Sequence, residues 1–216
     1  FHAITVPNHV HLLRAFMGGK SDQAVFDFSF TKADIRFAPP TTAELMFTQA
    51  TAGALRAAGG LAQLLFVAAV VLAARSRREL AALTAMLLAG EMLACTLAPR
   101  LAWQPAPRFV EAAAALTVAY LAAEILLFPK AGQRWLVVGA LGILHGLYFE
   151  LFIRTSSYKA AFVLAGASLA EVALIALFAF ALERLRRLTS SPALVRAPAA
   201  LFACIGLVWF FLRLRG

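Results

Sequence analysis

The sequence is poor in charged residues and in cysteine, and each scarcity excludes a class of protein. Only 14% of the 216 residues are charged, whereas 62% are hydrophobic, and the mean hydropathy is +0.81. Soluble globular domains carry about 25% charged residues, so the chain does not belong to that class. Its two cysteines, Cys95 and Cys204, lie far apart without CxxC spacing, which excludes a disulfide-stabilised small domain. The composition is that of an integral membrane protein.

The chain also lacks the short motifs that mark common active sites. It contains no phosphate-binding glycine loop, no HExxH zinc motif and no nucleophile elbow. Nothing in it resembles a nucleophile–base pair or a cofactor motif either. A membrane enzyme is therefore the least supported class, and we predict that the protein is not an enzyme.

Six apolar segments, each long enough to cross a membrane as a helix, fill residues 54–213. A helix needs about 20 mostly apolar residues to cross the roughly 30 Å hydrocarbon core. The breaks between the segments are polar or contain proline, and they are too short to hold a second domain. We expect an all-α fold, a polytopic membrane bundle of about six helices over residues 54–216. The predicted spans are 54–74, 80–98, 109–128, 135–153, 160–182 and 197–213.

The positions of the charges explain the net charge of +9 by topology rather than by nucleic-acid binding. By the positive-inside rule the more basic loops face the cytoplasm, which puts both chain ends on the periplasmic side of a bacterial inner membrane. Attraction to anionic lipid is a secondary effect. The first, third and fifth loops carry Arg75, Arg77, Arg78, Lys130, Arg134, Arg184, Arg186, Arg187 and Arg196. The second and fourth loops carry only Arg100, Arg108, Arg154 and Lys159.

Residues 1–53 differ in character and are predicted to be a short periplasmic segment. The chain opens at Phe1 rather than Met, so we expect a processed or incomplete form. Residues 25–31 alternate apolar and polar side chains, the period of a half-buried strand. Residues 41–53 are predicted to be amphipathic or re-entrant. His9 and His11 would share one face of a strand, and we interpret them as solvated histidines rather than a metal site.

Several ionisable side chains lie inside the predicted spans or at their edges. Because an ionisable group in hydrocarbon is costly, we expect these groups to face a shared interior. For any one glutamate, a hydrogen bond to the next helix is as well supported as a functional role. The residues are Glu91, Glu111, Glu124, His145, Glu150 and Glu171.

The third and fourth predicted spans carry the most chemistry. Glu111 and Glu124 lie thirteen residues apart on one helix, which separates them in depth by about 20 Å, too far to bind one ion. Gly142 and Gly146 flank His145 and would let a neighbouring helix approach closely. His145 is the only histidine in a predicted span.

At these residues the chain resembles the HupE/UreJ family of hydrogenase/urease accessory nickel permeases, over about residues 53–181. Pro107–Ala112 followed by Glu124 is similar to the family's proline-led helix with two glutamates. Leu144–Phe149 is similar to its histidine-glycine-leucine-glycine-phenylalanine segment. Gly53–Phe66 aligns with a segment that contains a histidine and then an aspartate-histidine pair. The resemblance implies a polytopic permease fold and nickel or cobalt as the transported substrate.

The chain departs from the family at positions that the resemblance implies are metal ligands or orient them. Arg56 stands at the first histidine, Ala62-Gln63 at the aspartate-histidine pair, and Gly90-Glu91 at a histidine-serine pair. Nickel and cobalt favour imidazole ligands, so a site reduced to His145 should bind metal weakly. The candidate metal ligands that the chain retains or substitutes are Glu91, Glu111, Glu124 and His145.

Arg56 is a candidate for charge compensation in place of a metal ion. A guanidinium is always charged and binds carboxylates bidentately, so it can neutralise a buried glutamate. This hypothesis requires Arg56 to lie within hydrogen-bonding reach of Glu91, Glu111 or Glu124. In the open alternative, Arg56 lies near the membrane surface with only its aliphatic stem buried.

The predicted function is that of an accessory or structural component of the inner membrane, built on a permease scaffold with most metal ligands lost. The alternative is a nickel or cobalt permease with a rearranged site, in which the metal ion is the substrate. No resident cofactor is predicted. The expected partners are the lipid bilayer and, as an open possibility, other membrane protein subunits, but not nucleic acid.

Overall fold

The computed structural model describes residues 11–26, 39–101, 105–129, 132–189 and 191–215. The chain divides into two compact units, residues 1–45 and residues 46–216. The predicted boundary lay at residue 53, whereas the division falls within the first helix.

A β-hairpin forms the described part of the first unit, before the first helix. Strands β1 (His11–Met17) and β2 (Lys20–Phe26) pair antiparallel. Gly18 and Gly19 connect them with φ angles of 55° and 76°. Two successive positive φ angles are typical of a type I′ turn, whose twist matches that of the strands, and glycine adopts them without strain.

The hairpin only partly matches the strand predicted at residues 25–31. That prediction overlaps the last two residues of β2, and residues 27–31 lie outside the described part of the chain. His11 opens β1, whereas His9 is not among the described residues, so the pairing of the two histidines stays a prediction.

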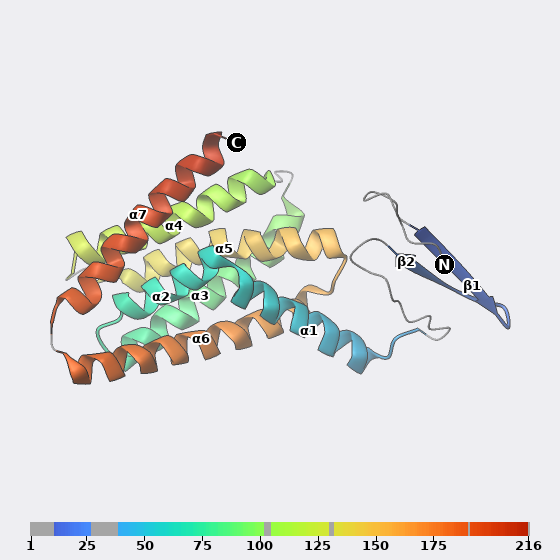
Figure 1. Ribbon diagram of the computed structural model, residues 1–216, viewed down its shortest axis with the longest axis horizontal. Helices are drawn as coiled ribbons and strands as arrows, with labels where there is room; N and C mark the ends of the chain where they lie inside the picture. Colours follow the sequence, from blue (N-terminus) through green and yellow to red (C-terminus); the bar gives the residue numbers. More distant parts are fainter. Residues whose placement is uncertain (1–10, 27–38, 102–104, 130–131, 190, 216) are drawn as a thin grey trace. The chain divides into compact units, whose positions relative to one another are not determined.

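The rest of the described chain folds into seven α-helices and one short 3₁₀ helix, joined by loops (Figure 1). Five of these helical segments are long and apolar enough to cross a membrane, or six if the bent pair α1 and α2 counts as one span. The predicted all-α polytopic fold is therefore confirmed. The helices are α1 (Thr42–Gly59), α2 (Leu61–Ala73), α3 (Arg77–Leu97), η1 (Ala98–Arg100), α4 (Pro107–Leu127), α5 (Arg134–Ser156), α6 (Ala160–Leu188) and α7 (Ala193–Arg215).

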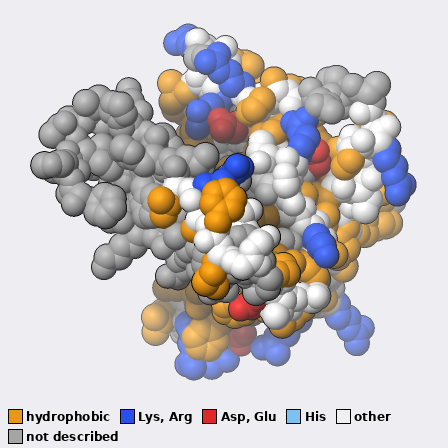
Figure 2. Space-filling view, turned by 90° about the vertical axis from the view of Figure 1, so that its right-hand side faces the viewer, with side chains coloured by type: hydrophobic (Ala, Val, Ile, Leu, Met, Phe, Trp, Pro, Cys, Tyr) orange, Lys and Arg blue, Asp and Glu red, His pale blue; other side chains and the backbone are white. Residues whose placement is uncertain are grey.

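From α2 onward, consecutive helices run in alternating directions (Figure 1). In Figure 1 the loops after α2, α4 and α6 lie at one end of the helical bundle, and the loop after α5 lies at the other. The loops predicted to be most basic are thus together. Figure 2 views the bundle from the side where α5 ends and shows Lys and Arg, Asp and Glu, and hydrophobic side chains interspersed there.

The first predicted span, residues 54–74, is wrong as a continuous helix. Residues up to Gly59 belong to α1, Gly60 adopts an extended conformation, and α2 starts at Leu61 with a bend of 72° between the helices. Hydropathy does not reveal this break because both sides of it are apolar. Two adjacent glycines lower the cost of ending the helix there.

A capping box starts α1. The Thr41 backbone N–H donates to Glu44 Oε2 at 2.9 Å, and the Glu44 N–H donates to Thr41 Oγ1 at 3.3 Å. This exchange satisfies two of the amide groups that a helix leaves free at its start. The stretch predicted to be amphipathic or re-entrant belongs to α1, which continues to Gly59 and forms a bent pair with α2.

Glycines allow α3 and α5 to pack in direct backbone contact. A Cβ on Gly90 of α3 would lie 2.3 Å from the carbonyl oxygen of Gly139, and a Cβ on Gly146 of α5 would lie 2.6 Å from the carbonyl oxygen of Glu91. Only glycine fits at such distances. The close approach predicted around His145 is confirmed, and it places α5 directly against the helix that carries Glu91.

The apolar core surrounds α2. Phe66, Val67 and Val70 of α2 are fully buried and cluster with Leu87 of α3 and Leu121 of α4. Because α2 lies inside the bundle, a polar side chain near its start faces other helices rather than lipid or water.

Candidate functional site

Gln63 forms the centre of a buried polar network. Its side-chain Nε2 donates to Glu91 Oε1 at 3.0 Å and also to Glu171 Oε1. Its side-chain oxygen contacts His145 Nδ1 at 2.5 Å. All four side chains are at most 2% exposed. Four different helices, α2, α3, α5 and α6, therefore meet at one glutamine.

Hydrogen bonds and stacking fix the ring of His145. The Gln63 oxygen can only accept a hydrogen bond, so Nδ1 carries a hydrogen. The other ring nitrogen, Nε2, lies 2.8 Å from Thr117 Oγ1, which also lies 2.7 Å from the carbonyl oxygen of Ala114. Phe66 stacks on the ring with the centroids 4.2 Å apart. Both ring nitrogens are thus already engaged, and a metal ion could reach either only by displacing a partner.

Glu91 and Glu171 share the Gln63 amide without a described cation beside them. Among the described residues no lysine or arginine forms an ion pair with either carboxyl group. Glu171 Oε2 is buried and has no hydrogen-bond partner among the described residues. The network therefore holds negative charge that a proton or another cation must balance.

A small cavity leads to this network. It has a volume of about 190 Å³, and both Gln63 and His145 line it, together with Glu111 and Arg213. The residues at the break between α1 and α2, from Gly59 to Ala62, form one wall. The bend that hydropathy does not predict is therefore the feature that opens the bundle toward its polar centre.

The four predicted metal ligands occupy three separate places. Glu91 and His145 share Gln63, whereas Glu111 pairs with Arg213 at 3.0 Å where both side chains are partly exposed. Glu124 pairs with Arg134. In the part of the chain that the structure describes, no three His, Cys, Asp or Glu side chains are grouped to hold a metal ion. The role of the four residues as ligands stays a prediction.

Arg134 binds Glu124 in a buried site at the other end of the bundle. Its Nε lies 3.0 Å from Glu124 Oε1, and the side chains are only 3% and 8% exposed. The guanidinium also donates to the carbonyl oxygens of Ala73 at 2.8 Å and Phe128 at 2.7 Å. These carbonyls lie at the ends of α2 and α4, where helices leave acceptors free. Arg134 thus joins three helix ends and neutralises a buried carboxylate.

Arg56 does not make the contact that its hypothesis requires. Its guanidinium carbon lies 3.7 Å from the centre of the Tyr148 ring, and its buried Nε has no hydrogen-bond partner. Among the described residues no glutamate forms an ion pair with it. A cation–π contact takes the place of the expected carboxylate pair. The guanidinium that does compensate a buried glutamate belongs to Arg134.

Three members of these sites were not among the predicted site residues. Gln63 stood out only as a departure from the family pattern, although it is a polar residue within the apolar stretch of α2. Thr117 gave no signal, because threonine is common in membrane helices. Arg134 was assigned to a loop by its charge. Glu171 was noted as a membrane glutamate, but its partner 108 residues away could not be read from spacing.

The fold and the site together define a class of protein, a polytopic α-helical membrane protein with a buried polar centre between its helices. The chain matches the family described as HupE / UreJ protein over residues 33–213, and it therefore belongs to the HupE/UreJ family. This confirms the resemblance and relates the protein to the membrane transport of nickel and cobalt. Comparison with curated proteins and comparison with solved structures gave no match.

Proposed function

We propose that this protein is an accessory membrane component in which the permease scaffold is kept while hydrogen bonds, rather than a metal ion, fill the polar centre. The position of the Gln63 amide carries this proposal. The amide donates hydrogen bonds to Glu91 and Glu171 at the same time. A divalent cation would bind the same two carboxylates. Nickel and cobalt favour imidazole ligands, and His145 already uses both ring nitrogens.

The second candidate is a nickel or cobalt permease with a rearranged site. The cavity that reaches Gln63 and His145 favours it, because an ion could approach the network through this cavity, which Glu111 also lines. In this case the Gln63 side chain would swing away, and Glu91, Glu171 and His145 would supply two carboxylates and one imidazole. A non-enzymatic role is common to both candidates.

Metal uptake distinguishes the two candidates. Cells that lack the gene are given wild-type protein, His145→Ala or Glu183→Gln as a surface control, and nickel and cobalt uptake is measured at equal protein levels. We expect no difference between wild type and His145→Ala, because the proposed role does not need a metal ligand. Uptake that wild type restores and His145→Ala abolishes would establish the permease.

For the orientation, we propose an inner-membrane location with both chain ends in the periplasm, because the most basic loops lie at one end of the bundle. In a chain without Cys95 and Cys204, Leu101→Cys and Gln133→Cys mark the two ends. A membrane-impermeant maleimide should label Leu101→Cys in intact cells and Gln133→Cys only after permeabilisation. The reverse pattern would show the opposite orientation.

A further inference from the structure

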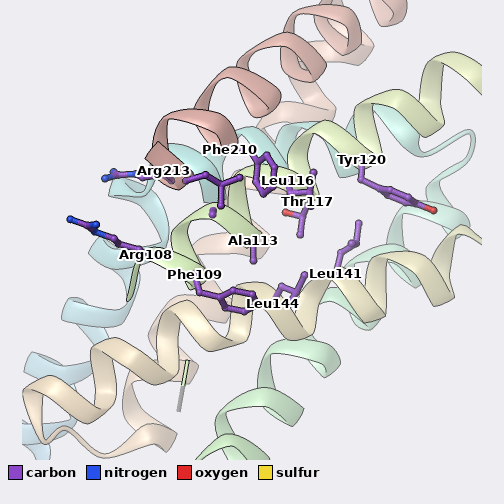
Figure 3. A pocket seen from close by; sticks show the side chains of 12 residues that line it. Arg108, Phe109, Ala113, Leu116, Thr117, Tyr120, Leu141, Leu144, Phe210 and Arg213 are labelled. Atoms are coloured by element: carbon purple, nitrogen blue, oxygen red, sulfur yellow. The ribbon is translucent and has the colours of Figure 1, made fainter. Parts of the chain in front are cut away.

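A second and larger hollow lies on the surface of the bundle, separate from the cavity that Gln63 lines. It has a volume of about 670 Å³ and lies between α4, α5 and α7. Figure 3 shows its walls, in which Phe109, Leu144 and Phe210 are among the apolar side chains. Arg108 and Arg213 lie together at one end of it, and Tyr120 lies at the other (Figure 3). The groove is therefore apolar along its length and basic at one end.

The length of the groove matches the depth of one lipid leaflet. Arg108 and Tyr120 are twelve residues apart on α4, which at 1.5 Å per residue gives about 18 Å. Half of a bilayer's hydrocarbon core is about 15 Å thick. Arg108 is the second residue of α4, and Arg213 is near the end of α7. A molecule that fills the groove would thus have its head at the membrane surface and its tail near the midplane.

The basic end is suited to a phosphate group. A guanidinium presents paired N–H donors that match phosphate oxygens, and the start of α4 adds the positive end of a helix dipole. Arg108 is exposed and forms no ion pair with any described residue. Arg213 is 45% exposed and pairs with Glu111. One cation is available, and the second is shared with a carboxylate.

We propose that this groove binds an anionic glycerophospholipid, with its phosphate at Arg108 and Arg213 and one acyl chain along α4. The site is independent of the function proposed above. Thr117, which contacts His145 Nε2, also lines the groove. The acyl chain of the bound lipid would therefore cover the polar centre from the membrane side. Arg213 lines both the groove and the cavity that leads to Gln63. A bound phosphate would therefore compete with Glu111 for it.

Native mass spectrometry of the detergent-purified protein tests the site. Phosphatidylglycerol, phosphatidylcholine and inorganic phosphate are added separately, and binding is measured for wild type, Arg108→Gln and Arg100→Gln. Arg100 is an exposed arginine outside the groove and serves as the matched control. We expect one phosphatidylglycerol per chain, about tenfold weaker binding in Arg108→Gln because a charged hydrogen bond is lost, and no change in Arg100→Gln.

A second pair of variants tests the acyl-chain part of the groove without changing charge. Ala113→Phe places a ring in the groove, whereas Ala176→Phe places one on the exposed surface of α6. Phosphatidylglycerol binding should fall in the first and stay unchanged in the second. Equal binding of both lipids, binding of free phosphate as tight as that of phosphatidylglycerol, or unchanged binding in both Arg108→Gln and Ala113→Phe would overturn the proposal.

Discussion

Replacing Arg134 by glutamine should lower the free energy of unfolding by about 3–5 kcal/mol. The substitution leaves the Glu124 carboxylate buried without its cation, and it removes the donors that bind the carbonyl oxygens of Ala73 and Phe128. The loss is large because the side chains are almost fully shielded from solvent. Equilibrium unfolding of the detergent-solubilised protein, followed by tryptophan fluorescence, measures the change.

The matched control is Arg77→Gln. Arg77 forms an ion pair with Glu183 on the surface, where its side chain is 89% exposed, and exposed pairs contribute little to stability. Its unfolding curve should match that of wild type. The double variant Glu124→Gln/Arg134→Met should recover part of the loss, since no uncompensated charge is left buried. Arg134→Gln with wild-type stability would show that the ion pair is not a structural element.

The second large effect is expected for Gln63→Leu. Leucine keeps the volume of the side chain but removes every hydrogen bond that Gln63 makes to Glu91, Glu171 and His145. Each buried group left without a partner costs about 1–3 kcal/mol. The free energy of unfolding should therefore fall by several times the amount that the loss of a single buried hydrogen bond would cost. Thermal unfolding in detergent would report it.

Gln49→Leu provides the comparison for Gln63→Leu. Gln49 is also a buried glutamine, but among the described residues only its side-chain oxygen forms a hydrogen bond, which it accepts from the backbone N–H of Lys159 at 2.9 Å. Its loss should cost distinctly less than that of Gln63. If the two variants unfold at the same temperature, Gln63 is not the centre of the network.

The sequence predicts the helices well because a membrane helix needs only length and apolar composition. Five of the six predicted spans correspond to α3 through α7, whereas the first is broken at Gly60. Hydropathy averages over a window, and a backbone break of one residue does not change the average. The glycine-mediated contact around His145 was predictable because glycine spacing on a helix marks a packing surface.

The polar network was predictable only in part. Glu91 and His145 were recognised as membrane-embedded polar groups, but Gln63 and His145 are 82 residues apart, and no spacing rule places them together. Their contact depends on how α2 and α5 pack. Similarly, Arg56 was the candidate named as the partner of a buried glutamate, whereas Arg134 was assigned to a loop. The contact of Arg134 with Glu124 depends on its position beside the ends of α2 and α4.

Metal content tests most directly whether hydrogen bonds, rather than a metal ion, occupy the polar centre. Wild type and Gln63→His are purified from cells grown with added nickel, and nickel and cobalt per chain are measured by elemental mass spectrometry. Wild type should carry far less than one ion per chain. Gln63→His places a second imidazole beside His145, Glu91 and Glu171, and it should gain bound metal. Wild type that retains one tightly bound nickel or cobalt ion, lost in His145→Ala, would contradict the account.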